Sequence, residues 1–314
     1  MQIKRYPGRR EFLKLTISAG VALLVNACQP QKPILPTPLP SPTATVTPTP
    51  APVPQPVSIS GTETWRINAK AVDQEYQIFI ALPASYNKSG KACPVLYLLD
   101  ANESFAMATG ITRMLQKSQI VPDFIIAGIG YPDEFSSQIS NLRGRDFTST
   151  QVTPPTDPYL SASFPSMSGG AANFLKFIRE ELKPVIDAKY RTNPADAALH
   201  GHSLGGLFSL YALLHHDGTF KRYIASSPSI WWDSKVIFQD EQDYAAKNTS
   251  LPANVFMSAG TDEGTMAADM QEMEAKVVSR NYSGLFIKSF VFESETHISV
   301  IPAAFSKGLR AVYP

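Results

Sequence analysis

The sequence predicts an α/β fold in which a mostly parallel central sheet carries helices on both faces. Strand-like and helix-like segments alternate from about residue 64 to residue 312, an order typical of parallel strands joined by crossover helices. Val95–Leu99 and Phe124–Ile129 are continuous apolar runs, as expected for strands that are covered on both faces. A serine framed by glycines stands between a short apolar segment and a helical one, and this order predicts a sharp strand-to-helix turn.

Residues 1–28 are typical of an export signal. The pair Arg9-Arg10 precedes the apolar stretch Leu15–Ala27, which is too short to span a bilayer comfortably. The run around the arginines resembles the twin-arginine signal, and Leu24–Cys28 resembles a bacterial lipobox. We expect Cys28 to be lipidated and the protein to be held at the periplasmic or extracytoplasmic face of the cell envelope. A cleaved secretory signal without a lipid is the alternative.

Residues 29–58 form a linker rich in proline and threonine. They hold 11 of the 26 prolines and a single charged residue, Lys32. Such a segment cannot bury a core and favours extended polyproline II structure. At about 3.1 Å per residue it would hold the following domain up to roughly 90 Å from the membrane.

The charge divides along the same boundaries. The whole chain of 314 residues carries +1, of which residues 1–28 hold +4 and the linker +1, so residues 59–314 carry −4. A mildly acidic block of this length suits one α/β domain and gives no reason to expect a nucleic-acid partner. With Cys28 lipidated, Cys93 has no partner for a disulfide within the chain and is expected to be a packed residue.

The other elements follow from the periodicity of apolar residues. Strands are expected at Thr64–Asn68, Glu75–Leu82, Ala197–His200, Tyr223–Ala225, Val255–Ala259 and Ile287–Phe292. Helices are expected at Phe105–Gln116, Ala172–Ile186, Leu204–His216, Met266–Ser279 and Ala303–Val312. Tyr131–Met167 fits neither period and contains several aromatic residues, so we interpret it as an irregular loop near a binding site.

Gly201-His202-Ser203-Leu204-Gly205-Gly206 has the GxSxG pattern of a nucleophile elbow. The turn lifts the Ser203 hydroxyl above the strand ends, at the N-terminus of a helix whose dipole favours negative charge. The N–H of Leu204 is a candidate oxyanion donor, and the amide of Asn102 or Ala101, in the loop after the third strand, is the candidate for the second.

His297 is the expected base. Of the five histidines, His200 and His202 belong to the strand and turn that carry the serine, while His215 and His216 lie about three turns along the next helix. His297 follows the last strand, in the position that the Ser–acid–His chain order requires. The acid is Asp262 or Glu263, after the strand Val255–Ala259. The His200/His202 pair lacks further ligands in the sequence, so no metal and no cofactor is predicted.

Six motifs are spread over residues 63–314: Pro94–Asp100, Arg145–Thr148, Gly201–Leu207, Ser227–Trp232, Gly260–Glu263, and His297 with Ser299–Pro302. Together they resemble the Putative esterase family of α/β-hydrolases, which includes esterase D-like enzymes, feruloyl esterases, mycolyltransferases of the antigen 85 type and catecholate-siderophore esterases. The siderophore-esterase branch is the most similar.

The resemblance implies an α/β-hydrolase fold for residues 59–314 and a serine esterase that acts through an acyl-enzyme on a small-molecule ester. It implies that Glu263 is the acid. The family usually has glycine where this chain has Ala101, but an alanine keeps the backbone N–H. The candidates for substrate contact, for which a structural role is an equal alternative, are Arg143, Arg145, Phe147 and Trp231. An acyltransferase or a catalytically silent binding lipoprotein are the alternative functions.

Overall fold

The computed structural model describes residues 56–133, 137–153, 164–215 and 217–313, and Val57–Pro314 forms one compact unit. The predicted export signal and the lipidation of Cys28 lie outside the described residues. Among the residues that are described, no helix is long and apolar enough to cross a membrane.

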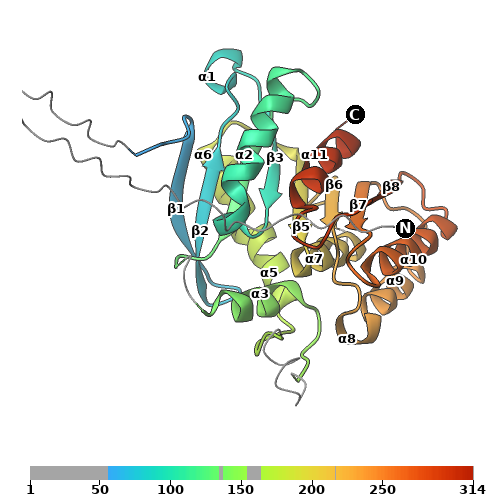
Figure 1. Ribbon diagram of the computed structural model, residues 1–314. Helices are drawn as coiled ribbons and strands as arrows, with labels where there is room; N and C mark the ends of the chain where they lie inside the picture. Colours follow the sequence, from blue (N-terminus) through green and yellow to red (C-terminus); the bar gives the residue numbers. More distant parts are fainter. Residues whose placement is uncertain (1–55, 134–136, 154–163, 216, 314) are drawn as a thin grey trace, which may run out of the picture. The chain divides into compact units, whose positions relative to one another are not determined.

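The described chain forms a sheet of eight strands in the order β1-β2-β4-β3-β5-β6-β7-β8 (Figure 1). β2 pairs antiparallel with both β1 and β4, and all other neighbours are parallel. The predicted α/β fold with a mostly parallel sheet is confirmed. The strands are β1 (Thr62–Ala69), β2 (Gln74–Ala81), β3 (Cys93–Leu98), β4 (Ile125–Gly130), β5 (Thr192–His202), β6 (Arg222–Ser226), β7 (Asn254–Gly260) and β8 (Phe286–Phe292).

Helices cover both faces of this sheet. α2 and α11 pack on one face, while α5, α7 and α10 pack on the other (Figure 1). The helical segments are α1 (Tyr86–Ser89), α2 (Ala101–Lys117), α3 (Ile139–Phe147), α5 (Ala171–Phe177), the π-helix η1 (Ile178–Leu182), α6 (Lys183–Lys189), α7 (Leu204–Leu214), α8 (Trp232–Lys235), α9 (Ile237–Ala245), α10 (Met266–Ser279) and α11 (Ile301–Val312).

Alternate side chains of the central strands supply the two halves of the core. In β3, Val95 and Tyr97 belong to the half beneath α5 and α7, whereas Leu96 and Leu98 belong to the half beneath α2 and α11. All four are almost fully buried, which explains why this strand reads as a continuous apolar run. Cys93, at the start of β3, is buried and free, and burial raises the pKa of its thiol.

Four helical segments were not predicted, namely the one-turn helices α1 and α8 and the longer α3 and α9. The expected irregular stretch Tyr131–Met167 contains α3, and α9 follows the elbow's neighbouring strand β6. α3 has few apolar positions and carries Gly144 in its interior, so no helical pattern of apolar residues marks it. Its stability comes from tertiary contacts, and the principal one is made by a buried acid.

That acid is Asp146, which is fully buried near the C-terminal end of α3. One oxygen accepts hydrogen bonds from the hydroxyls of Tyr76 (2.6 Å) and Tyr131 (3.0 Å), and the other accepts from Arg145 Nε at 2.7 Å. Burial raises the pKa of Asp146, although Arg145 and the two tyrosines oppose this rise. The network therefore fastens α3 to β2 and to the end of β4.

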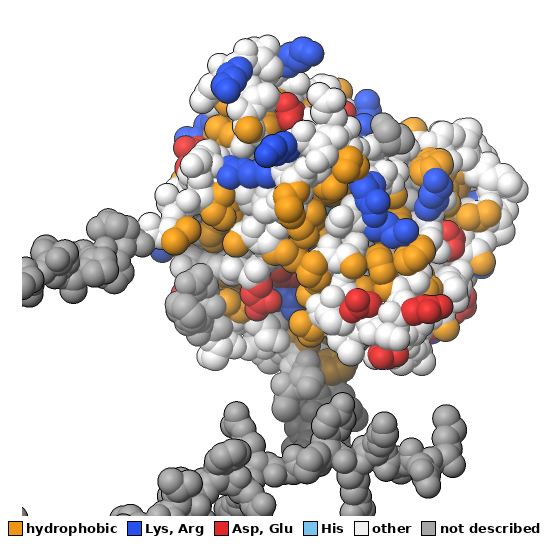
Figure 2. Space-filling model, turned by 45° about the horizontal axis from the view of Figure 1, so that its top comes forward, with side chains coloured by type: hydrophobic (Ala, Val, Ile, Leu, Met, Phe, Trp, Pro, Cys, Tyr) orange, Lys and Arg blue, Asp and Glu red, His pale blue; other side chains and the backbone are white. Residues whose placement is uncertain are grey.

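The surface has no single dominant character on the face shown in Figure 2, where basic, acidic and apolar side chains are interspersed. The apolar side chains that are more than half exposed include Met114 and Ile298. Ile298 directly follows His297 in the chain.

We predict that Asp146→Ala lowers the free energy of unfolding by about 3–5 kcal/mol, because it leaves the Arg145 charge and two tyrosine hydroxyls without their buried partner. Urea unfolding measures this loss. Glu75→Ala is the control, since Glu75 pairs with Arg66 at the exposed surface and its removal should cost about 1 kcal/mol or less. Equal losses for the two variants would contradict the structural role of Asp146.

Candidate active site

The turn between β5 and α7 is built by close backbone contacts. A Cβ atom on Gly201 would lie 2.1 Å from the carbonyl oxygen of Gly205, and one on Gly206 would lie 2.7 Å from that of Ser226. Only glycine avoids both collisions. Ser203, between them, has φ 60° and ψ −121°, a strained conformation for a residue with a side chain. The turn thus presents Ser203 at the carboxyl end of the sheet.

Three side chains from separate loops form a continuous hydrogen-bonded row. His297 Nε2 lies 2.9 Å from Ser203 Oγ, and His297 Nδ1 lies 2.7 Å from Glu263 Oε2. An ionised carboxylate only accepts hydrogen bonds, so Nδ1 carries the proton and Nε2 is left as an acceptor for the serine hydroxyl. The elbow supplies Ser203, the loop after β7 supplies Glu263, and the turn before α11 supplies His297.

Glu263 is held ionised by its surroundings. Burial alone would raise the pKa of its carboxyl, but hydrogen bonds from His297, Gly260 N–H and the Ser227 hydroxyl outweigh burial and lower it. Asp262, the other candidate acid, is exposed, and its backbone N–H binds the carbonyl of Glu295. The structure therefore brings Glu263, and not Asp262, to the imidazole.

The two histidines of the elbow have different surroundings from His297. The ring of His202 lies 4.5 Å from that of His297, and neither of its nitrogens has a hydrogen-bond partner among the described residues. Burial, with a smaller contribution from the charge that His297 carries when it is protonated, lowers the pKa of His202 to about 3. Burial also lowers the pKa of His200 to about 3. Both imidazoles are therefore neutral around pH 7.

The two predicted oxyanion donors both stand in the first turn of a helix. Leu204 begins α7, and Asn102 is the second residue of α2, so their N–H groups have no acceptor within their own helices. The Asn102 side chain binds the Tyr131 backbone twice, by accepting from its N–H (2.7 Å) and donating to its carbonyl (2.8 Å). These two hydrogen bonds fasten the start of α2 to the end of β4. The role of the Leu204 and Asn102 N–H groups as oxyanion donors stays a prediction.

A cavity of about 670 Å³, here called the main cavity, opens beside Ser203 and His297. Its wall combines apolar side chains, including Met107, Ile139 and Ile298, with charged ones. Arg143 Nε and Nη2 bind the two carboxylate oxygens of Asp100 at 2.6 and 2.9 Å. Arg143 thus lines the cavity as expected, and Asp100 fixes the orientation of its guanidinium group.

The other candidates for substrate contact lie elsewhere. Arg145 binds Asp146, and Phe147 is buried against Phe174 and Phe208. Neither lines the main cavity; both hold α3 in place, and their contact with substrate stays a prediction. Trp231 is 41% exposed and packs edge-to-face on Phe164. It also lies outside the lining of the main cavity, and its contact with substrate stays a prediction.

Two site residues were missed. After β6, Ser227 donates to Glu263 Oε1 at 2.8 Å, and Ser229 Oγ lies 3.4 Å from Ser203 Oγ. The sequence shows a serine cluster, Ser226-Ser227-Pro228-Ser229, directly after a predicted strand. The carboxyl ends of neighbouring parallel strands meet at one edge of a sheet. The position of the cluster, directly after the strand next to the elbow, could therefore have indicated that these serines lie in the site.

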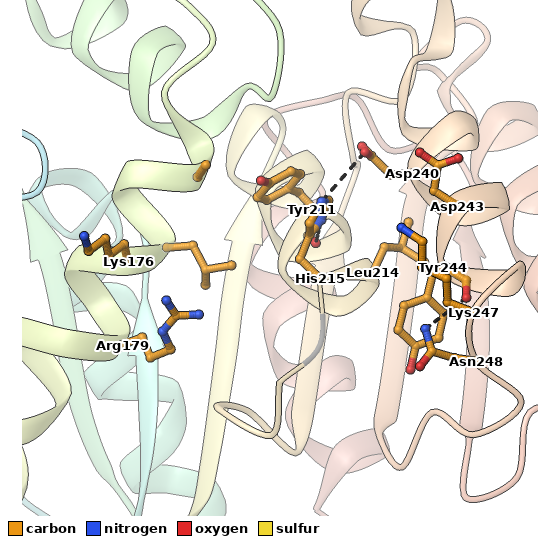
Figure 3. Close-up of a pocket in the computed structure, with 12 residues that line it drawn as sticks. Lys176, Arg179, Tyr211, Leu214, His215, Asp240, Asp243, Tyr244, Lys247 and Asn248 are labelled. Carbon is orange, nitrogen blue, oxygen red and sulfur yellow. Dashed lines mark hydrogen bonds and ion pairs between the residues drawn. The ribbon is translucent and has the colours of Figure 1, made fainter.

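A second cavity of about 520 Å³ lies between α5, α7 and α9 (Figure 3). Lys176 and Arg179 stand on one side of it, and Asp243, Tyr244 and Lys247 stand on the other. None of the residues of the hydrogen-bonded row lines this cavity. Among the described residues, no group of three or more His, Cys, Asp or Glu side chains is arranged to hold a metal ion.

Comparisons with known proteins find a matching family, similar sequences and similar structures. The model of the family described as "Putative esterase" matches residues 69–286. Ferri-bacillibactin esterase BesA of Bacillus subtilis is 34% identical over 270 residues, which cover 82% of this chain and 91% of the relative. The crystal structure of the BES protein from Bacillus cereus superposes with a TM-score of 0.74 at 32% identity, covering 83% of this chain and 99% of that one. Siderophore hydrolase EstA from Aspergillus nidulans gives 0.71 at 28% identity, covering 82% and 97%.

We predict that the destabilisation caused by Glu263→Gln depends on pH. Because the folded pKa of Glu263 is depressed, its ionised form stabilises the fold fully above the unfolded pKa of about 4.3, and this contribution is lost as pH falls through the folded pKa. Urea unfolding should therefore show a large difference between wild type and variant at pH 7 that shrinks below about pH 4. A difference of constant size would contradict the prediction, and the exposed Glu293→Gln serves as control.

Proposed function

The chain belongs to the Putative esterase family, and from that premise we propose that it is a serine esterase that hydrolyses siderophore esters through an acyl-enzyme at Ser203. The observation that carries the serine mechanism is the row from Ser203 through His297 to Glu263, with both hydrogen bonds formed at 2.9 and 2.7 Å. In such a row the imidazole activates the hydroxyl and the carboxylate stabilises the imidazolium that forms.

In the acylation half-reaction, Ser203 Oγ attacks the ester carbonyl while His297 Nε2 removes its proton. The carbonyl oxygen becomes an oxyanion, for which the N–H groups of Leu204 and Asn102 are the proposed donors. The tetrahedral intermediate then collapses as the C–O bond to the alcohol breaks, and His297 returns the proton to that leaving oxygen. Glu263 stays ionised throughout, in agreement with its lowered pKa.

In the deacylation half-reaction, water takes the place of the alcohol. His297 removes a proton from the water as it attacks the acyl carbonyl, and Ser203 Oγ leaves and recovers a proton from His297. The neutral state of His202 supports this cycle, because a second positive charge 4.5 Å from the His297 ring would oppose protonation of His297.

The proposed substrate class rests on the relatives and on the cavity. BesA is named a ferri-bacillibactin esterase and EstA a siderophore hydrolase. The main cavity, at about 670 Å³, lies within the range that holds a sizeable organic ligand. Its apolar wall suits aromatic acyl groups, and Arg143, held by Asp100, offers a cation for the oxygens of a catecholate. We propose a catecholate-siderophore ester as the substrate.

We predict that a fluorophosphonate probe labels the folded protein at Ser203, and that the protein cleaves a ferric catecholate trilactone to its linear acids. Ser203→Ala should abolish labelling, and Ser203→Ala or His297→Ala should lower kcat/KM by about 10⁴-fold or more. Mass spectrometry identifies the labelled residue and the products. Cys93→Ser, a buried change outside the site, is the control. A folded wild-type protein that resists the probe would overturn the serine mechanism.

We further propose that the protein is exported as a lipoprotein anchored through Cys28, because a twin-arginine-like run and a lipobox-like motif precede the proline-rich linker. Expression of the full chain in a bacterial host should place it in the membrane fraction with a lipid on Cys28, detected by mass spectrometry. Cys28→Ser should release it to the soluble fraction, whereas Cys93→Ser should not. Membrane association that survives Cys28→Ser would refute the anchor.

A further inference from the structure

The loop after β6 places a second hydroxyl at the nucleophile. Ser229 is 1% exposed, and its Oγ lies 3.4 Å from Ser203 Oγ. Its backbone N–H also donates to the carbonyl of Ser203 at 3.1 Å. Ser229 is therefore fastened to the nucleophile's own backbone, and its hydroxyl is held beside the oxygen that would react.

The protons at this contact can be assigned. Glu263 accepts a hydrogen bond from the Nδ1–H of His297, so His297 Nε2 is an acceptor and receives a hydrogen bond from the Ser203 hydroxyl, which uses its single proton. Ser203 Oγ then has only lone pairs to offer to Ser229. For both contacts to exist at once, Ser229 must be the donor, and among the described residues its hydroxyl has no other recorded partner.

We propose that Ser229 is a further catalytic residue, whose hydroxyl donates to Ser203 Oγ and stabilises the negative charge that develops there. The inference rests on the proposed serine mechanism. As His297 removes the proton from Ser203, the neutral Ser229–Ser203 contact becomes a hydrogen bond to an anionic oxygen, and such bonds are shorter and stronger. The present 3.4 Å exceeds the usual O–H···O distance of about 2.7–2.8 Å, so the bond has room to shorten as charge appears.

The same donor acts in both half-reactions. During acylation it stabilises the attacking oxygen, and during deacylation it stabilises Ser203 Oγ as the leaving group. Ser229 keeps its proton throughout, and every transferred proton still passes through His297, so the balance of the reaction is unchanged. Because the interaction is stronger in the transition state than in the resting enzyme, its loss should lower the rate of the chemical step more than it changes substrate binding.

The test is the rate constant for covalent labelling of Ser203 by a fluorophosphonate, with kcat/KM for an ester measured alongside. Ser229→Ala should lower both by roughly 10- to 100-fold, the range expected for losing one hydrogen bond to a charged atom. Ser229→Cys, a weak donor of similar size, should fall between wild type and Ser229→Ala. Ser258→Ala is the matched control, since Ser258 is also fully buried and its hydroxyl has no partner among the described residues.

The rate constant separates chemistry from folding, because a loss of folded protein lowers the amount labelled and leaves the rate constant of the folded fraction unchanged. If Ser229→Ala does not fold, the labelling rate constant of Ser229→Cys tests the role of Ser229 in its place. Labelling of Ser229→Ala, or of Ser229→Cys in that case, within about twofold of wild type would overturn the role of Ser229 alone. A wild-type protein that is not labelled would refute the serine mechanism, and the role of Ser229 with it.

Discussion

The close approach between the β5–α7 turn and the end of β6 is the constraint on which the rest of the site depends. Ser203 N–H donates to the carbonyl of Ser226 at 3.0 Å, and the Ser203 carbonyl accepts from Ser229 N–H at 3.1 Å. The N–H of Ser203 is thus bound to the last residue of β6, and its carbonyl is bound to the loop that follows β6. The contact depends on Gly206, where a Cβ atom would collide with the Ser226 carbonyl oxygen, whereas Gly201 permits the turn itself by leaving room for Gly205. The contact also brings Ser227 and Ser229 into the site.

The fold, Ser203 and His297 could be predicted from local patterns and chain order, whereas the choice of Glu263 over Asp262 came from the family resemblance. Continuous apolar strands indicate burial on two faces, and the glycine-framed Ser203 indicates a turn with a particular place in the sheet. Elimination among five histidines left His297, which the structure brings to Ser203. These inferences use chain order and backbone geometry, which a single sequence contains.

The surroundings of these residues could not be predicted in the same way. The sequence does not show which of Arg143, Arg145 and Phe147 faces a cavity. All three are charged or aromatic residues within one polar stretch. The formation of α3 separates them: Arg143 faces the main cavity, whereas Arg145 and Phe147 face the core. α3 depends on a long-range network between Asp146 and tyrosines 70 and 15 residues away in the chain, and no local pattern encodes such a contact.

Four non-glycine residues with positive φ stand at the same edge of the sheet. Asp100, Ser203, Ser227 and Ser294 all have positive φ values, between 43° and 60°, and they follow β3, β5, β6 and β8 within one or two residues. A conformation of this kind costs free energy and persists only where the surroundings hold it. Here the central strands β3 and β6 and the second half of β5 are largely buried, so the sheet can hold strained turns at its carboxyl end. These turns aim the Asp100 carboxylate at Arg143, the Ser203 hydroxyl at His297 and the Ser227 hydroxyl at Glu263. A rigid core therefore accounts for the precision of a site in which Ser203, Glu263 and His297 all stand on turns or loops between elements.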